Sequence, residues 1–514
     1  ISCASLELRS AERKKDMISL ETQRFLTPPV SPCTRMTDHL TLLQMNDSHG
    51  YLEQHPELFW AGDRAEYRMA GGYARIAALI EEVRDARRER VLAFDCGDTI
   101  HGTYPAVRSE GEALVPILNA LGFDAMTAHW EFAYGPEQFQ KVARDLDYPV
   151  LAINCYDATT NDLVFPPYAI CETDGLQVGV IGIAATIVDK VMPPSFSKGL
   201  RFSLGSAELP GYVARLRDDE RVDLVVVVSH LGFPQEVKLA REVDGIDLLL
   251  SGHTHNRLFE PALVNNTIII QSGCHGSFLG RLDLTVENRR VKRFNHDLII
   301  VGEAVRPDPG VEEMVGKVMD PHRECLSRVV GEARTGLNRN TVLEATMDNL
   351  LLQALLSATG ADMAFSNGWR YGAPVPPGPV TVNDLWNIIP ANPPVSMVEI
   401  MGRELRVMME ENLDRTFARD PYNQMGGYVK RCMGVNLYCK LENPPGFRIQ
   451  EFFAGGKRLD PDAVYRAAFV TGQGVPANYG KNREDLDLRA VEALERYLAG
   501  GPASADLRGS VVAI

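Results

Sequence analysis

Short apolar runs alternate with amphipathic stretches along this chain, beginning near residue 37. Two apolar runs, His39–Met45 and Arg90–Phe94, predict β-strands, and between them Tyr73–Arg84 has the spacing of an amphipathic helix. This alternation is typical of a layered α/β domain rather than of a helical bundle or an all-β sandwich. Further strands are predicted at Tyr148–Ile153, Val178–Ile183, Asp223–Val228, Ile246–Leu250, Thr267–Gln271 and Gly280–Val286.

The pattern becomes helical and charged between residues 301 and 330, and we place an inter-domain linker there. A first domain is therefore expected at residues 37–300 and a second α/β domain at residues 331–514. Within the second domain, helices are predicted at Met347–Ser357 and Arg403–Leu413, on either side of a proline-rich turn at Pro374–Pro379. Residues 1–36 are polar, contain several prolines and lack the apolar core of a secretory signal, so we expect a disordered or non-native tail.

Net charge, apolar runs and cysteine content limit the binding partners and the compartment expected for this protein. The 514 residues include 53 Lys and Arg against 68 Asp and Glu, a formal net charge of −15. Such a surface repels phosphate backbones, so we expect no nucleic-acid partner, and a small anionic substrate would need a local cationic trap such as a metal. No run approaches the ~18 consecutive apolar residues that span a bilayer, so no membrane partner is expected. Nine cysteines without a CxxC pair favour reduced thiols, and we expect a cytoplasmic protein.

Histidine and aspartate recur in one kind of position, a short loop just after an apolar run. Two candidate ligands stand two residues apart in Asp47-Ser48-His49 and again in His253-Thr254-His255. In extended backbone, side chains two residues apart point to the same side. Carboxylates and imidazoles together are typical ligands of divalent transition metals. A single histidine at a strand end is ordinarily a capping or surface residue, but a set in equivalent loops predicts a metal centre. The candidate ligands are Asp47, His49, Asp98, His129, His230, His253 and His255.

In their order and spacing, these motifs resemble the calcineurin-like metallophosphoesterases of the 5'-nucleotidase and UDP-sugar hydrolase type. The C-terminal part is similar to the substrate-binding domain of that family, in Asn367-Gly368-Trp369-Arg370 and in the segment that leads into Gly402-Arg403-Glu404-Leu405. The resemblance covers about residues 37–480. It implies a four-layer metallophosphoesterase β-sandwich flanked by helices, followed by a second α/β domain of the 5'-nucleotidase type.

The resemblance also implies two divalent metal ions bridged by Asp98. One ion would take Asp47, His49, Asp98 and His255, and the other Asp98, His129, His230 and His253. Two such ions can hold a hydroxide at neutral pH and neutralise an anionic ester during in-line attack. The mixed ligand shell admits Mn, Zn, Fe or Mg, of which we favour Mn. Glu131 lies close to a ligand and is expected to orient an imidazole from the second coordination sphere.

The chain departs from the nucleotidase pattern at one catalytic motif. Nucleotidases of this family carry Gly-Asn-His-Glu-Phe-Asp, whereas this chain has Ala128-His129-Trp130-Glu131-Phe132-Ala133. His129 can replace the metal-binding Asn, but Trp130 and Ala133 replace the histidine and aspartate that assist the leaving group. Tryptophan cannot shuttle a proton, and general acid catalysis is typically worth ~10²–10⁴-fold. The His-Trp-Glu-Phe stretch and Asp420–Gly427 are similar to the thiosulfohydrolases of sulfur oxidation, which act on a carrier protein's cysteine persulfide.

The residues that would clamp a nucleotide base also differ. Val429–Gly434 has no aromatic residue at the aligned clamp position, so we expect Arg370 and Arg431 to bind the anion, together with Asn367. We take hydrolysis of small anionic esters, of the 5'-nucleotidase-like phosphomonoester kind, as the predicted function. A thiosulfohydrolase-like enzyme with a sulfur-carrier partner is the alternative. A binding protein that holds metal but has lost catalysis is a third hypothesis.

Overall fold

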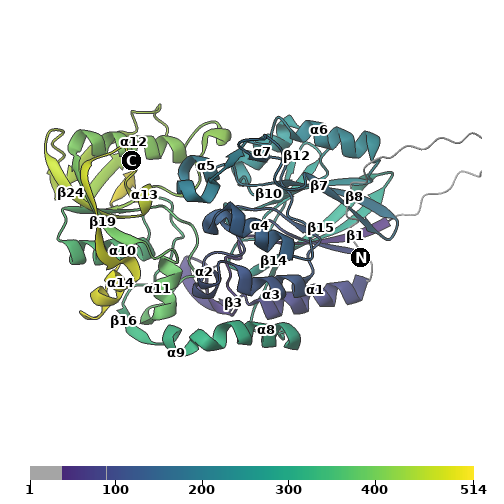
Figure 1. The fold of residues 1–514 in the computed structure, drawn as a ribbon, viewed down its shortest axis with the longest axis horizontal. Helices are drawn as coiled ribbons and strands as arrows, with labels where there is room; N and C mark the ends of the chain where they lie inside the picture. The colour runs from purple at the N-terminus through teal and green to yellow at the C-terminus, as the bar shows by residue number, and fades with distance from the viewer. Residues whose placement is uncertain (1–37, 88–89) are drawn as a thin grey trace, which may run out of the picture.

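The computed structural model describes residues 38–87 and 90–514, which form an N-terminal and a C-terminal lobe (Figure 1). The tail predicted for residues 1–36 lies outside the described residues. Within the described part of the chain, no helix combines the length and the apolar character that a membrane crossing requires.

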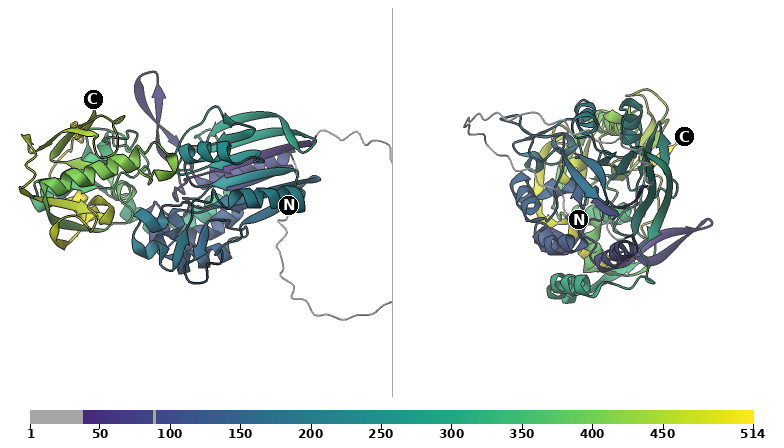
Figure 2. Two further views of the ribbon diagram at one scale, coloured as in Figure 1. Left: turned by 90° about the horizontal axis from the view of Figure 1, so that it is seen from above. Right: turned by 90° about the vertical axis from the view of Figure 1, so that its right-hand side faces the viewer.

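Two β-sheets face each other in the N-terminal lobe (Figure 2). Alternate apolar residues of both sheets, such as Leu42 and Phe94 in one and Val180 and Val226 in the other, meet in a single core. One sheet has the order β15 (Arg290–Ile300), β14 (Phe278–Glu287), β1 (Asp38–Met45), β4 (Val91–Asp95) and β5 (Ala125–Met126). The other has the order β12 (Ala262–Val264), β13 (Thr267–Ile270), β11 (Leu248–Ser251), β10 (Leu224–Ser229), β8 (Leu176–Ile183) and β7 (Tyr168–Thr173).

Helices cover the outer face of each sheet because every second strand residue points away from the shared core. Ile76 of α1 packs with Leu43 outside the first sheet, and Leu239 of α7 packs with Val227 outside the second. The result is the predicted order of helix, sheet, sheet, helix. The main outer helices are α1 (Tyr73–Arg87), α3 (Val115–Leu121), α4 (Pro136–Asp145), α6 (Leu209–Ala214) and α7 (Phe233–Glu242).

Parallel strand pairs bring the candidate ligand loops to one end of this lobe. Strand β1 is parallel to β4 and β4 to β5, while β8, β10, β11 and β13 are mutually parallel. The carboxyl ends of parallel strands lie at the same edge of a sheet, which is where α/β proteins place binding groups. Smaller elements near this edge are α2 (Tyr104–Arg108), α5 (Val188–Val191), β6 (Cys155–Asp157), β9 (Leu200–Phe202) and the 3₁₀ turn η2 (Trp130–Tyr134).

A helical segment runs below both lobes in Figure 1. It consists of α8 (Pro309–Met319), η5 (Asp320–His322) and α9 (Arg323–Leu326). The C-terminal lobe has one sheet in the order β20 (Arg431–Met433), β17 (Met363–Ser366), β24 (Val464–Val470), β19 (Pro394–Met401) and β25 (Lys481–Arg489). A second sheet has the order β23 (Lys457–Arg458), β22 (Ile449–Ala454), β21 (Val435–Cys439) and β26 (Val511–Ala513). A short pair is formed by β16 (Val329–Ala333) and β18 (Gly378–Thr381). The helices are α10 (Thr346–Thr359), α11 (Val382–Ile388), α12 (Gly402–Thr416), α13 (Thr471–Gly474) and α14 (Ala490–Leu498).

Three details differ from the sequence-based expectations. The predicted strand Tyr148–Ile153 is buried but makes only an isolated bridge, between Val150 and Met126, and Pro149 has no N–H to donate to a ladder. Strand β15 was not predicted because most of its residues are polar, as an edge strand allows. The hairpin of β2 (His55–Ala61) and β3 (Arg64–Ala70) was also not predicted, and it stands out from the N-terminal lobe (Figure 2).

Candidate metal centre

The ligand loops have an unusual backbone. Five of the seven candidate ligands adopt a left-handed conformation, with φ between 50° and 73°. Positive φ is uncommon for residues other than glycine, and such residues concentrate at functional sites. The five residues are Asp47, His49, Asp98, His253 and His255.

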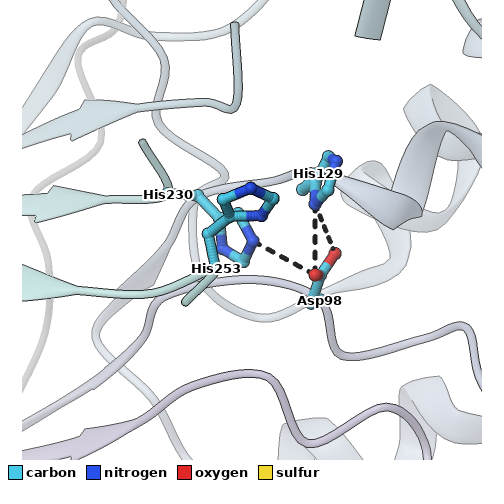
Figure 3. Close-up of side chains that lie close together, drawn as sticks. All are labelled: Asp98, His129, His230 and His253. Carbon is cyan, nitrogen blue, oxygen red and sulfur yellow. Dashed lines mark hydrogen bonds and ion pairs between the residues drawn. The ribbon is translucent and has the colours of Figure 1, made fainter. Parts of the chain in front are cut away.

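All seven candidate ligands come together as two groups that share Asp98. Within each group the potential ligand atoms lie within 4.8 Å of one another. The first group is Asp98, His129, His230 and His253 (Figure 3), and the second is Asp47, His49, Asp98 and His255. These are the two sets that the resemblance implied.

Asp98 lies at the centre of this arrangement. His129 Nδ1 is 3.1 Å from Asp98 Oδ1, and His230 Nε2 is 3.1 Å from Asp98 Oδ2 (Figure 3). On the other side His49 Nε2 is 3.9 Å from Asp98 Oδ2, and His255 Nε2 is 3.1 Å from Asp47 Oδ1. One carboxylate thus faces imidazoles from both groups.

The donor atoms fit divalent cations. His49 Nε2 and His255 Nε2 face each other at 3.3 Å, and His230 Nε2, which faces Asp98, is buried without a hydrogen-bond partner among the described residues. Buried polar atoms are ordinarily paired, and a cation between facing lone pairs would satisfy them. Two carboxylates and five imidazoles supply the mixed oxygen and nitrogen shell of Mn, Zn or Fe sites.

Outer hydrogen bonds fix the orientation of the imidazoles. His49 Nδ1 is 3.1 Å from the carbonyl oxygen of His101, and His230 Nδ1 is 2.5 Å from the carbonyl oxygen of Cys96. A second ring nitrogen bonded to a backbone carbonyl is the usual arrangement of a metal-binding histidine, because it leaves the other nitrogen free for the ion.

Glu131 contacts the loop backbone rather than an imidazole ring. Its carboxylate accepts hydrogen bonds from the backbone N–H of Thr99 at 2.7 Å and of His129 at 2.6 Å, so it ties the loop of Asp98 to the loop of His129. Asp95 braces the loop of Asp98 from within, because it accepts from the hydroxyl of Thr99 and from the backbone N–H of Gly97.

Burial and charge set the protonation of the centre. Burial alone would raise the pKa of Asp98, but the neighbouring His129 and His230 hold it well below the usual value. Burial lowers the pKa of His49 to about 3, and burial followed by the charge of Arg370 lowers that of His253. At His230 burial is outweighed by the carboxylates of Asp98 and Asp47, which raise its pKa to about 10. An ionised carboxylate and neutral imidazoles are the forms that bind metal, so His49 and His253 are ready to bind whereas His230 would release its proton to an ion.

The centre forms the floor of a pocket of about 530 Å³ between the two lobes. Asn367 and Arg370 line this pocket from the C-terminal lobe. Arg370 donates to the carbonyl oxygen of His253 at 3.1 Å and to that of Gly427 at 2.9 Å, so its guanidinium joins the metal loops to the C-terminal lobe. A second link is made by Gln473, which donates to the carbonyl oxygen of Val191 at 2.9 Å.

Arg431, the other predicted anion-binding arginine, does not line the pocket. Its side chain is 1% exposed, lies 3.0 Å from the Asp348 carboxylate and donates to the carbonyl oxygens of Thr341 and Val342. Its charge and its donors are therefore used inside the C-terminal lobe.

Sequence reasoning singled out Trp130 but gave too little weight to other residues around the pocket. Trp130 lines it, and its indole is stacked against His101, which is buried behind it. Tyr371 packs edge-on against Trp130 with ring centroids 5.6 Å apart. Lys430 also lines the pocket although only 5% exposed, and its ammonium donates to the carbonyl oxygen of Gln473. The adjacent charged residues Lys430 and Arg431 lie between apolar Val429 and Cys432, and this was the available signal for Lys430.

Fold and site together define a two-domain metal-dependent hydrolase, in which a metallophosphoesterase-type domain holds the ligand groups and a C-terminal domain completes the pocket. The second domain is of the 5'-nucleotidase kind, since residues 327–472 match the family model described as 5'-nucleotidase, C-terminal domain. The resemblance predicted from the sequence is confirmed.

Three known proteins illustrate the relationship. The trifunctional nucleotide phosphoesterase protein YfkN of Bacillus subtilis is 23% identical over 84% of this chain, which spans 31% of YfkN. The sulfate thiohydrolase SoxB of Thermus thermophilus superposes with a TM-score of 0.86 at 25% identity, over 95% of this chain and 98% of SoxB. A 5'-nucleotidase precursor, also from Thermus thermophilus, has the same fold, with a TM-score of 0.82, 24% identity and coverage of 93% and 99%.

Proposed function

We propose that this protein hydrolyses small anionic esters, and that its substrates are 5'-nucleotidase-like phosphomonoesters. The observation that carries the proposal is the position of Asp98, which both ligand groups share on the floor of a pocket that also holds Arg370. We further propose that the metallophosphoesterase domain is residues 37–300, the linker 301–330 and the C-terminal domain 331–514.

The seven ligands would hold two divalent cations, with Mn²⁺ as the proposed pair. Such cations supply activation of water at neutral pH and neutralise charge on the ester. Arg370 lies beside His253, where its guanidinium can bind ester oxygens in a bidentate manner and orient the substrate. Asn367 adds an amide on the same wall of the pocket.

Trp130 defines which leaving groups are suitable. Its indole N–H can donate a hydrogen bond but cannot deliver a proton to a departing alkoxide. Esters whose leaving group is stable as an anion therefore need less general acid catalysis than nucleoside monophosphates, whose leaving group is an alkoxide. We expect kcat/KM for p-nitrophenyl phosphate to exceed that for 5'-AMP.

The test is initial-rate hydrolysis of both esters by the Mn²⁺-loaded protein, with and without EDTA. EDTA-sensitive release of phosphate from either ester supports the proposal. Loaded protein that releases no phosphate from any phosphomonoester contradicts it. An Asp98→Asn variant that retains full activity contradicts the assignment of the site.

A further inference from the structure

A third group of metal-ligand side chains lies outside the two groups around Asp98. It comprises His55 and Glu57 from strand β2, and His275 from the loop that follows β13. All three are buried, with exposed fractions of 6%, 1% and 3%, and their potential ligand atoms lie within 4.8 Å of one another.

The ligand atoms converge on one point. Glu57 Oε2 is 3.1 Å from His275 Nδ1. The hydroxyl of Ser277 is 3.0 Å from Glu57 Oε2 and 3.1 Å from His55 Nε2. These spacings match those between ligand atoms in the metal centre, where Asp98 lies 3.1 Å from both His129 and His230.

Outer contacts direct two of the ligands inward. His55 Nδ1 is 3.3 Å from the carbonyl oxygen of Glu53, which leaves Nε2 facing the group. Glu57 Oε1 accepts from Arg257 at 2.8 Å and from the backbone N–H of Leu58 at 2.9 Å, so Oε2 is the oxygen that faces Ser277 and His275. A ring nitrogen bonded to a carbonyl, and a carboxylate held through its other oxygen, are the outer contacts that support metal ligands.

His275 shares two features with the candidate ligands of the metal centre. Its Nδ1 faces a carboxylate, and its buried Nε2 has no hydrogen-bond partner among the described residues, as is also true of His129. Its backbone is left-handed, with φ of 59°, as at Asp98. Gly71 makes room for this arrangement, because a Cβ there would lie 2.7 Å from Cε1 of His55.

We propose that His55, Glu57 and His275 form a third metal site, for Zn²⁺. Two imidazoles and one carboxylate are a recognised zinc ligand set, and the fourth position would be filled by the Ser277 hydroxyl or by water. The proposal is independent of the reaction catalysed at the pocket.

The site would have a structural role. It joins the projecting β2–β3 hairpin to the loop of His275, whose backbone N–H donates to the carbonyl oxygen of Asp47 at 2.7 Å (Figure 2). An ion there would fix that loop against a ligand loop of the metal centre. Because ion binding stabilises the folded chain, its loss should lower the melting temperature.

The experiment measures zinc per chain by elemental mass spectrometry after dialysis against Zn²⁺, with full-length protein. We expect His55→Asn to lose one equivalent of zinc relative to the unaltered protein. The matched control is His39→Asn, because His39 is exposed on β1, and it should lose none. Equal zinc contents in the unaltered protein and in a folded His55→Asn variant would overturn the proposal.

A second variant covers the case in which His55→Asn does not fold. Asp47→Asn with Asp98→Asn removes the carboxylates of the metal centre but leaves the third group intact. This protein should retain at least one equivalent of zinc and melt at a higher temperature with Zn²⁺ than with EDTA. Absence of zinc from this variant would overturn the third site without affecting the proposed function, which activity of the unaltered protein tests separately.

Discussion

The indole of Trp130 stacks face to face on the imidazole of His101, with ring centroids 4.7 Å apart and planes 5° from parallel. Trp130 lines the pocket beside the metal centre, and in the resemblance to nucleotidases it stands at the sequence position of the histidine that assists the leaving group. His101 itself does not line the pocket, and its Nδ1 is 3.2 Å from the hydroxyl of Tyr134. The pair therefore provides a rigid aromatic surface in place of a proton donor.

Restoring the dyad should change the preference among leaving groups. We expect Trp130→His with Ala133→Asp to raise kcat/KM for 5'-AMP by ~10-fold or more, toward the ~10²–10⁴-fold range of general acid catalysis, and to affect p-nitrophenyl phosphate much less. Ala133→Asp alone is the matched control and should not raise it. If both esters respond equally, the tryptophan does not limit departure of the leaving group.

Asp98 should be indispensable because both ligand groups depend on it. Asp98→Asn keeps the size of the side chain but removes the charge, so we expect loss of metal from the pocket and a fall in kcat of ~10³-fold or more, in keeping with the several kcal/mol that metal catalysis supplies. His322→Asn, which changes a histidine outside both groups, should retain activity. The measurements are metal content and initial rates on the same preparations.

Two arginines predicted to bind the anion should behave differently when changed to methionine. Arg370→Met should leave metal content nearly unchanged and lower kcat/KM by ~10²-fold, the upper end of the ~1.5–3 kcal/mol of a charge-assisted hydrogen bond. It should lower the free energy of unfolding less than Arg431→Met does, because it removes two hydrogen bonds to carbonyl oxygens but no buried ion pair. Arg431→Met should instead lower the free energy of unfolding by ~3 kcal/mol or more, because it removes one of the two arginines that pair with buried Asp348 and leaves the carbonyl oxygens of Thr341 and Val342 without their donor. Kinetics and urea unfolding distinguish the two, and an unchanged KM and kcat for Arg370→Met would refute its assigned part.

Lys430 predicts a pH dependence of stability. Burial lowers its pKa to about 7, whereas an unfolded lysine titrates near about 10.4. Between these values the unfolded chain binds more protons, so the unfolding free energy rises with pH, and the cost of burying the ammonium is greatest below about pH 7. Lys430→Met should therefore stabilise the protein most at low pH.

The check is urea unfolding of Lys430→Met and of the unaltered protein at about pH 6 and about pH 9. A shift of one pKa unit corresponds to about 1.4 kcal/mol of unfolding free energy. The gain from the substitution should shrink by at least ~1 kcal/mol between the two, on the same conversion. Lys317→Met is a suitable control, because Lys317 is exposed on α8. A gain that does not change with pH would contradict the prediction.

The ligand groups could be predicted because the Asp-x-His and His-x-His patterns follow parallel strands, which must end at one edge. The course of Tyr148–Ile153 could not, since its apolar residues are buried whether or not they pair with a strand. The surroundings of Arg431 could not be predicted either, because Asp348 lies far away in sequence and contacts Arg431 only when α10 packs on β20. Local pattern fixes which residues face a sheet edge, whereas partners of charged side chains depend on tertiary packing.

The hydrogen bonds from Arg370 to His253 and from Gln473 to Val191 each cross from one lobe to the other. Separation of the lobes would remove the guanidinium from the floor of the pocket and break both bonds. A ligand that contacts both lobes therefore stabilises the contact between them. By thermodynamic linkage, the contact between the lobes strengthens ligand binding by the same free energy. Ligand affinity in this pocket and the stability of the contact between the lobes are two measures of one coupling free energy.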